Sequence, residues 1–315
     1  MQSSISRRLF LGMAASLAAL DRTAGASIPF AAGCRDAMLK HLGKPDPWSA
    51  AKAVGAEVIE VAVDDKFGLP LLSYPGRQYT LATDEGIKQL SNDVKESGLK
   101  ICAFCLSNQF EARADFEVDF SAKVARIAKK LGVKVIRIDV VPRKLTVEQF
   151  LDPAAAALNK LIEATKGTGV SFGVENHGRG ANNPAFAVPL LERVNSKRFG
   201  LTLDVGNFYW YGHPRPKVYE LVEKFAPRVV HTHCKSIQYP ADQRDVQRAI
   251  GWEYMKYVAP ITRGDVDYKR VVKILRAAGY KGDLCVENEG LGKLPEADRI
   301  AELAAEIKYL KELRA

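Results

Sequence analysis

Apolar residues recur along the chain in two alternating patterns. Stretches with helical spacing end near a glycine, and a short run rich in β-branched residues follows each of them. This unit occurs seven times, at residues 48–65, 85–108, 122–141, 157–178, 187–207, 218–236 and 268–290. A further apolar run at 28–35 comes first, and a helical pattern at 296–313 comes last. The chain is therefore expected to contain eight strands separated by helices.

Strands that alternate with helices are expected to be parallel, because each helix carries the chain back to the start of the sheet. Eight such units in one chain favour an α/β fold of one domain, the closed (β/α)8 or TIM barrel, over residues 27–315. The alternative is an open doubly wound sheet, which usually carries G-x-G-x-x-G after its first strand, and no such motif follows 28–35. Five glycines are expected to end helices: Gly55, Gly98, Gly132, Gly169 and Gly279.

Residues 1–26 have the layout of a secretory signal. Arg7 and Arg8 precede Phe-Leu and a short apolar stretch, and Ala24-Gly25-Ala26 supplies small residues for cleavage. The arginine pair resembles a twin-arginine export signal, and an ordinary secretory signal is the alternative. We expect cleavage after Ala26, export to the periplasm, and no membrane association after the signal is removed.

The overall composition favours a soluble enzyme over a nucleic-acid binder. The chain has 315 residues, 47% of them hydrophobic, and a formal net charge of +9. Lysines and arginines alternate with acids, as at 85–100, instead of forming the basic stripe typical of nucleic-acid binding.

Five cysteines are present, and Cys102 and Cys105 form C-x-x-C within an expected strand. Strand alternation would point these two thiols to opposite faces, so buried free thiols are expected in place of a redox or zinc pair.

Four neighbouring strands are expected to end in a carboxylate or an imidazole. These residues are Glu175, Asp204, His233 and Glu287, each after an apolar run. The active site of a TIM barrel lies at this end of the strands, and crowded carboxylates there require a neutralising partner. One divalent ion (Mn²⁺, Mg²⁺, Co²⁺ or Zn²⁺) suits three carboxylates and one imidazole. Pairing of single acids with Arg or Lys is the alternative.

Two histidines, His231 and His233, share one face of one expected strand. His233 is nearer the carboxyl end of the strand and is the expected ligand. His231 should lie one layer deeper, where it would either support His233 or contact a substrate.

The strand-end motifs resemble those of the xylose isomerase-like TIM barrel superfamily, the sugar phosphate isomerase/epimerase family. They are GVENHG at 173–178, GLTLDVGN at 200–207, VVHTHCKS at 229–236 and LCVENEG at 284–290. The resemblance implies that Glu175, Asp204, His233 and Glu287 bind one divalent metal, and that Glu175 and Glu287 also exchange protons with the substrate. Asn207 stands where epimerases of the family have a second histidine, and Ser236 where the family often has an aspartate.

The long connection at 236–267 is expected to be a lid or a binding loop, with a surface excursion or a contact within a homo-oligomer as alternatives. The aromatic run at 208–214 is expected to wall the site or to pack in the core. Seven residues at these positions and at the strand ends are predicted to bind substrate: His177, Asn207, His231, Lys235, Arg244, Arg248 and Trp252.

The predicted function is that of a metal-dependent sugar isomerase or epimerase that acts on a small carbohydrate. A glutamate would remove a proton next to a carbonyl, and an enediolate would form. A 3-keto-glycoside lyase that uses the same first step is one alternative, with Lys235 or His177 at the leaving carbon. A non-catalytic sugar-binding protein on the same barrel is the other.

Overall fold

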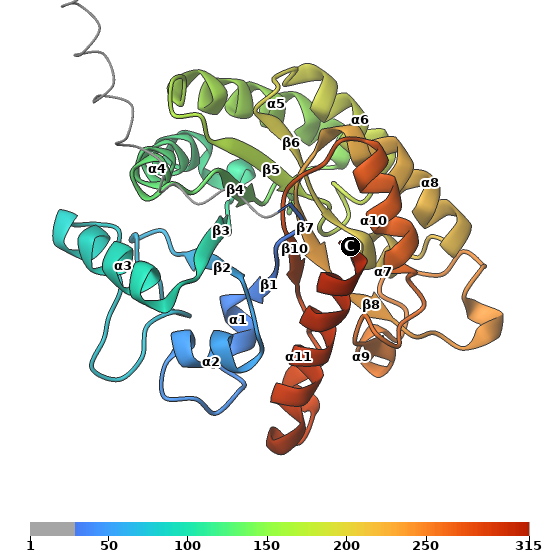
Figure 1. Cartoon of the computed structure of the whole chain (residues 1–315). Helices are drawn as coiled ribbons and strands as arrows, with labels where there is room; N and C mark the ends of the chain where they lie inside the picture. Colours follow the sequence, from blue (N-terminus) through green and yellow to red (C-terminus); the bar gives the residue numbers. More distant parts are fainter. Residues whose placement is uncertain (1–28, 315) are drawn as a thin grey trace, which may run out of the picture.

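The structure of the protein is a computed structural model that describes residues 29–314. Parallel strands form one closed barrel, in which β1 lies between β2 and β10 (Figure 1). The barrel strands are β1 (Ala32–Arg35), β2 (Val58–Val63), β3 (Lys100–Leu106), β4 (Val135–Ile138), β5 (Ser171–Glu175), β6 (Phe199–Asp204), β7 (Val229–Cys234) and β10 (Leu284–Val286). The predicted (β/α)8 barrel of a single domain is therefore confirmed.

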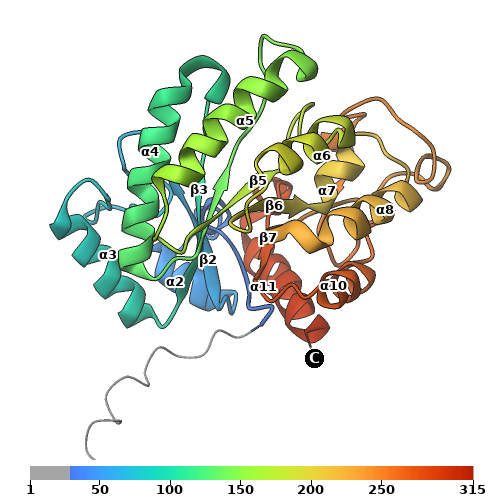
Figure 2. The same cartoon turned by 90° about the horizontal axis from the view of Figure 1, so that it is seen from above.

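Helices surround the barrel and cover the outer face of its strands (Figure 2). They are α1 (Asp36–Leu39), α2 (Pro47–Ala53), α3 (Asp84–Ser97), α4 (Phe110–Leu131), α5 (Val147–Ala164), α6 (Pro184–Arg193), α7 (Val205–Trp210), α8 (Arg215–Phe225), α9 (Tyr254–Tyr257), α10 (Tyr268–Ala277) and α11 (Glu296–Leu313). Short 3-10 turns occupy Ala226–Arg228, Ala241–Gln243 and Leu291–Lys293. Outside the barrel, β8 (Ser236–Ile237) and β9 (Val258–Ala259) pair as a small antiparallel ribbon.

Local capping explains where the helices begin and end. The Thr83 side chain accepts a hydrogen bond from the backbone N–H of Gly86 at the start of α3, and Gly98 ends the helix with φ of 73°. The five glycines predicted to end helices all have positive φ, between 69° and 83°. A residue with a Cβ pays a steric penalty in that conformation. Gly98 and Gly132 are the C-caps of α3 and α4, and Gly55 and Gly279 directly follow the C-caps of α2 and α10. Gly169 lies beyond the end of α5, whose C-cap is Thr165, so the prediction that it ends this helix was wrong.

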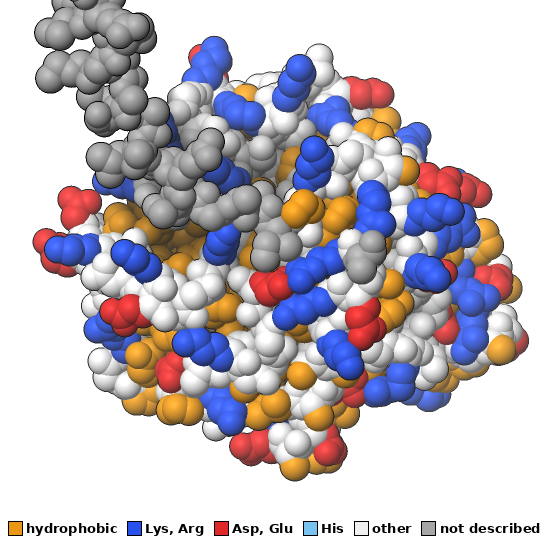
Figure 3. All heavy atoms as spheres, viewed as in Figure 1, with side chains coloured by type: hydrophobic (Ala, Val, Ile, Leu, Met, Phe, Trp, Pro, Cys, Tyr) orange, Lys and Arg blue, Asp and Glu red, His pale blue; other side chains and the backbone are white. Residues whose placement is uncertain are grey.

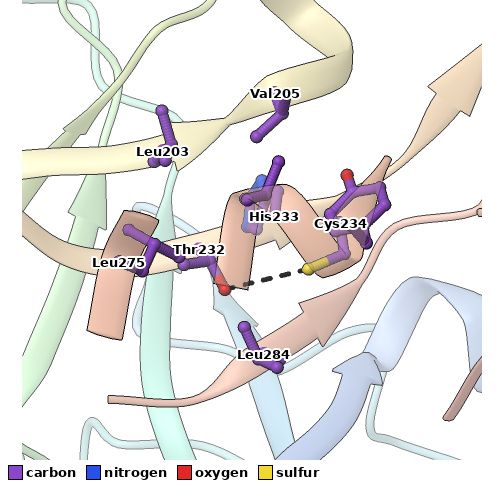
Figure 4. A pocket seen from close by; sticks show the side chains of 9 residues that line it. Leu203, Val205, Thr232, His233, Cys234, Leu275 and Leu284 are labelled. Carbon is purple, nitrogen blue, oxygen red and sulfur yellow. Dashed lines mark hydrogen bonds between the residues drawn. The ribbon is translucent and has the colours of Figure 1, made fainter. Parts of the chain in front are cut away.

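Each barrel strand presents one set of side chains to the helices and the other to the barrel interior. Thr232 and Cys234 of β7 line a small apolar cavity with Leu275 of α10 (Figure 4). His231 and His233 alternate with them and reach Glu60 of β2 inside the barrel. The period of two residues along β7 therefore places both histidines in the interior, at two successive levels.

Gly33 of β1 is predicted to be essential for closing the barrel. A Cβ at this position would lie 1.8 Å from the carbonyl oxygen of Val58 on β2. Because backbone atoms of a central strand cannot move aside, Gly33→Ala should lower the free energy of unfolding by about 3 kcal/mol or more, or prevent folding. Urea denaturation followed by circular dichroism measures the loss. Gly98→Ala is the control, since its Cβ would meet no atom within 4 Å and should cost about 1 kcal/mol for its left-handed backbone. Equal losses in the two variants would contradict the close-approach argument.

No helix within residues 29–314 has the length and apolar character needed to cross a membrane. The predicted signal, residues 1–26, lies outside the described residues, so its cleavage and the export of the chain stay predictions. On the face shown in Figure 3, basic and acidic side chains are interspersed with apolar ones.

Candidate metal centre

The barrel brings together the four residues that were predicted to bind a metal. Glu175 ends β5, Asp204 ends β6, His233 lies near the end of β7, and Glu287 directly follows β10. One ligand atom from each lies within 4.8 Å of the others, and all four residues are buried. β5, β6, β7 and β10 are consecutive neighbours in the barrel, so their carboxyl ends converge on one point.

The donor atoms of this cluster fit a divalent cation. Nδ1 of His233 and Oδ2 of Asp204 are buried and make no hydrogen bond, although Nζ of Lys235 lies 3.2 Å from this Oδ2. Nδ1 of His233 lies 3.4 Å from a carboxylate oxygen of Glu175 and 3.4 Å from one of Glu287. Unpaired buried polar atoms are costly, and an ion between them would satisfy them. Three carboxylates with one imidazole suit Mg²⁺, Mn²⁺, Co²⁺ or Zn²⁺.

Cationic side chains surround the cluster. Arg137 of β4 donates two hydrogen bonds to Glu175, one of them from Nε at 2.6 Å. Arg35, at the end of β1, pairs with Glu287 and with Glu60. Lys235 Nζ lies 3.2 Å from Asp204 and 3.3 Å from Glu287. The two glutamates thus have fixed cationic partners on the side away from the shared centre, and only the lysine contacts Asp204.

These contacts set different protonation tendencies in the three carboxyl groups. Burial alone would raise the pKa of Glu175, but the charges of Arg137 and His233 outweigh it and hold the pKa below its usual range. Lys235, Arg35 and His233 likewise outweigh burial and hold the pKa of Glu287 well below its usual range. For Asp204, burial and the neighbouring glutamates outweigh Lys235 and raise the pKa to about 7. The glutamates are therefore ionised at neutral pH, whereas Asp204 needs a cation to stay ionised.

Glu60 of β2 holds both histidines. Its Oε2 accepts hydrogen bonds from Nε2 of His231, at 2.6 Å, and from Nε2 of His233, at 2.8 Å. A carboxylate only accepts, so each ring carries a hydrogen on Nε2, and Nδ1 of His233 is the nitrogen that faces the cluster. His231 is fully buried, and its Nδ1 faces Asp283. The structure therefore gives His231 a supporting position below His233 in place of the predicted contact with substrate.

Glu60→Gln is expected to weaken binding of a divalent ion about 10–100-fold, because the amide no longer fixes both imidazoles in one tautomer. Titration of the chelator-treated protein with Mn²⁺ measures the affinity. Glu57→Gln is the matched control, since Glu57 pairs with Arg314 outside the cluster. An unchanged affinity in Glu60→Gln would contradict the proposed orientation of His233.

Three other predicted substrate-binding residues lie at the cluster or its rim. Asn207 links two candidate ligands, since its backbone N–H donates to Asp204 and its side chain donates to Glu175 at 2.9 Å. Lys235 also contacts Glu289 at 2.9 Å. His177 is half-exposed, and its Nδ1 lies 3.1 Å from Asp139. The hydrogen bond with Asp139 raises the pKa of His177 above its usual value.

The remaining predicted substrate-binding residues lie in the connection at 236–267, where they pack against the loop itself. Arg248 is buried, lies over the rings of Tyr209 and Tyr239, and donates to backbone carbonyls of the loop and of α7. Arg244 pairs with Asp265 at 3.0 Å, and Trp252 stacks on Tyr257 with ring centroids 5.7 Å apart. The structure thus gives Arg248 a structural role in place of the predicted contact with substrate, because its guanidinium satisfies carbonyls that have no strand partner.

Three site residues were not predicted: Arg35, Glu60 and Arg137. Glu60 and Arg137 were visible in the sequence as charged residues within apolar strands, and Arg35 as the residue that ends an apolar run. A buried charge requires a partner, so a charged residue at each of these positions indicated a buried ion pair. The sequence did not identify the partners, because Glu60 and His231 lie 171 residues apart.

Comparison with known proteins finds relatives that are similar to part of this chain. An inosose dehydratase of Serratia proteamaculans is 25% identical over 167 residues, which make up 50% of this chain and 53% of that protein. The chain spans about half the length of the first curated relatives it matches.

Solved structures show the likeness in fold. The IOLI protein with a bound zinc atom aligns with a TM-score of 0.65 at 16% identity and covers 88% of this chain and 96% of its own. A D-tagatose 3-epimerase-like protein aligns with a TM-score of 0.61 at 18% identity, over 91% and 100% of the two chains. The sequence profile of one family matches residues 48–313. The chain belongs to the xylose isomerase-like TIM barrel family.

Proposed function

We propose that this protein is a metal-dependent isomerase or epimerase of a small carbohydrate, which removes a proton next to a carbonyl group. The observation that carries the proposal is the convergence of Glu175, Asp204, His233 and Glu287 within 4.8 Å at the carboxyl ends of the barrel strands. Two of these residues are glutamates on strands separated by β6 and β7, so they reach the shared point from two sides. A site for binding alone would need no such pair of flanking bases.

Different side chains of the site have different roles in the proposed reaction. A bound divalent ion would polarise the carbonyl and stabilise the charge of an enediolate. One glutamate accepts the proton of the adjacent C–H bond. Its counterpart is also ionised in the resting site, so it must first take up a proton from solvent, which it then returns to the opposite face of the planar enediolate. Arg137 holds Glu175, and Arg35 holds Glu287, in the ionised form that a base requires. Lys235 lies between Asp204 and Glu287, where it can contact a substrate oxygen.

A second candidate, a dehydratase or 3-keto-glycoside lyase, is favoured by the pair of His177 and Asp139. A half-exposed histidine with a raised pKa is a proton donor at the rim of the site. In this reaction a glutamate takes the C–H proton, the electron pair forms a C=C bond, and the group on the next carbon leaves with a proton from His177. Relatives named inosose dehydratase support this candidate.

We propose that the connection at 236–267 forms one wall of the substrate site. Tyr254 of α9 donates a 2.6 Å hydrogen bond to Glu289, which in turn contacts Lys235. Trp252 and Tyr257 add aromatic faces, which suit the apolar faces of a sugar ring.

Solvent-deuterium exchange tests the proposed function. Chelator-treated protein, reloaded separately with Mg²⁺, Mn²⁺, Co²⁺ or Zn²⁺, is incubated in D₂O with ketoses, aldoses, keto-inositols and 3-keto-glycosides, and the products are followed by NMR. Deuterium at the carbon next to the carbonyl supports the proposal, and the product then separates the candidates, since an epimer keeps its substituents and an enone has lost one. Binding without exchange across the whole panel would instead favour a sugar-binding protein.

A further proposal concerns the compartment in which the protein acts. We propose that the chain acts in the periplasm after cleavage behind Ala26, on sugars that are not phosphorylated, because Arg7 and Arg8 begin a signal-like segment. Changing both arginines to lysine should keep the protein in the cytoplasm at its full length. Cell fractionation with mass spectrometry of the intact protein measures this, and a native protein that retains residues 1–26 would refute cleavage.

A further inference from the structure

A second cluster of metal-binding side chains lies deeper in the barrel than the candidate metal centre. Cys102 of β3, His231 of β7 and Asp283, just before β10, place one ligand atom each within 4.8 Å of the others. Cys285 of β10 is a hydrogen-bonding neighbour of Cys102 and also lies within 4.8 Å of a ring nitrogen of His231. We call these four residues the lower cluster.

An irregularity in β3 brings Cys102 into this cluster. Ile59 pairs with Ile101, but Glu60 pairs with Ala103, so Cys102 is an extra residue between them. A bulge of this kind turns a side chain out of the regular alternation. Cys102 and Cys105 consequently both have the interior carboxylate Glu60 among their charged neighbours. The prediction that these two thiols point to opposite faces was therefore wrong.

The hydrogen bonds of Glu60 leave a particular atom of His231 facing the lower cluster. Because Nε2 of His231 donates to Glu60, its Nδ1 is the atom that faces Asp283, at 3.1 Å from Oδ1 and 2.9 Å from Oδ2. Oδ2 of Asp283 is buried and has no hydrogen-bond partner. Either a proton or a cation can therefore lie between this imidazole nitrogen and the carboxylate.

The same arrangement occurs one level higher, where Nδ1 of His233 faces Glu175 and Glu287 at the candidate metal centre. Glu60 thus orients two imidazoles so that each presents Nδ1 to its own group of acidic side chains. The two groups differ in chemistry. Carboxylates dominate the upper one, whereas the lower cluster contains thiols, which prefer Zn²⁺ to Mg²⁺ or Mn²⁺.

We propose that Cys102, His231 and Asp283 form a second metal site that binds zinc. A thiolate, an imidazole and a carboxylate are ligands that zinc takes in proteins, and Cys285 is a second thiol next to Cys102. The ion would tie β3, β7 and β10 together in the part of a TIM barrel that serves stability. Cys102 is partly buried.

Cobalt substitution tests the second site without any substrate. The full chain is freed of metal under reducing conditions and reloaded with Co²⁺, which shows an intense near-ultraviolet absorption only when thiolates coordinate it. We expect two Co²⁺ ions per chain and this absorption in the wild type. Cys102→Ser should lose one ion and the absorption, whereas Asp204→Asn should lose the other ion and keep the absorption. Cys34→Ser is the matched control, because Cys34 is a buried thiol outside the lower cluster, and it should keep both.

One Co²⁺ ion per chain without thiolate absorption in the wild type would overturn the proposal, and Nδ1 of His231 would then carry a proton that it shares with Asp283. Alkylation of the wild type provides a second test if Cys102→Ser does not fold. Zn²⁺ should slow the reaction of Cys102 with iodoacetamide at least about tenfold. An equal rate with and without Zn²⁺ would also overturn the proposal.

Discussion

Glu175→Gln and Glu287→Gln are each expected to lower the rate of substrate proton exchange by about 10²–10⁴-fold, the usual contribution of a positioned general base. Glutamine is nearly isosteric with glutamate, but its amide cannot accept a proton from carbon. The wild-type carboxylates are kept ionised by Arg137 on one side of the centre and by Arg35 and Lys235 on the other. Each substitution therefore removes a charged base and leaves its cationic partners in place.

Metal content decides how this loss is interpreted, because both glutamates are also candidate ligands. Exchange is measured by NMR in D₂O at saturating metal, and bound metal is measured on the same samples by mass spectrometry. Glu302→Gln is the control, since Glu302 of α11 pairs with Arg263 and is not among the candidate ligands. A variant with bound metal and wild-type exchange would remove that glutamate from the acid–base role and favour Lys235 or His177.

Asp204→Asn is expected to reduce metal affinity at the upper centre by more than the roughly 10–100-fold typical of lost supporting residues. Asparagine can still accept the hydrogen bond from the backbone N–H of Asn207, at 2.8 Å in the wild type. It lacks the charged Oδ2, which is the buried oxygen without a hydrogen-bond partner. The fold should therefore persist while the ion is lost. Calorimetric titration with Mn²⁺ measures the affinity, and wild-type affinity in this variant would exclude Asp204 as a ligand.

The raised pKa of Asp204 adds a pH dependence with a defined sign. Burial and the neighbouring carboxylates raise this pKa to about 7, so protons compete with the ion below that pH. Wild-type affinity for Mn²⁺ should fall about tenfold for each unit below pH 7.

The same raised pKa makes the stability of the metal-free fold depend on pH. Protonated Asp204 contributes stability that is complete below about pH 4 and is lost as the pH rises through about 7. Metal-free Asp204→Asn should not show this loss, and thermal unfolding between pH 4 and pH 8 measures the difference.

The sequence by itself determined the barrel and the position of the candidate metal ligands. Helical spacing and strand alternation are local properties, so the repeated units could be recognised without knowledge of any contact. Parallel strands bring their carboxyl ends to one rim, so Glu175, Asp204, His233 and Glu287 could be expected to meet. The order of His231 and His233 along β7 also follows from the period of two residues.

Only the tertiary structure decided which buried charged groups pair with one another. It also decided to which face of the sheet the side chain of a residue in a β-bulge points. Glu60 meets His231 and His233 across 171 and 173 residues of sequence, and Arg35 meets Glu287 across 252. Such partners depend on the stagger of neighbouring strands, which a bulge changes by one residue, as it does at Cys102. Arg248 joins carbonyls of a loop that has no periodic pattern. The local pattern therefore specifies the strands and their ends, whereas long-range packing decides which groups those ends meet and which nitrogen of each histidine faces its cluster of candidate ligands.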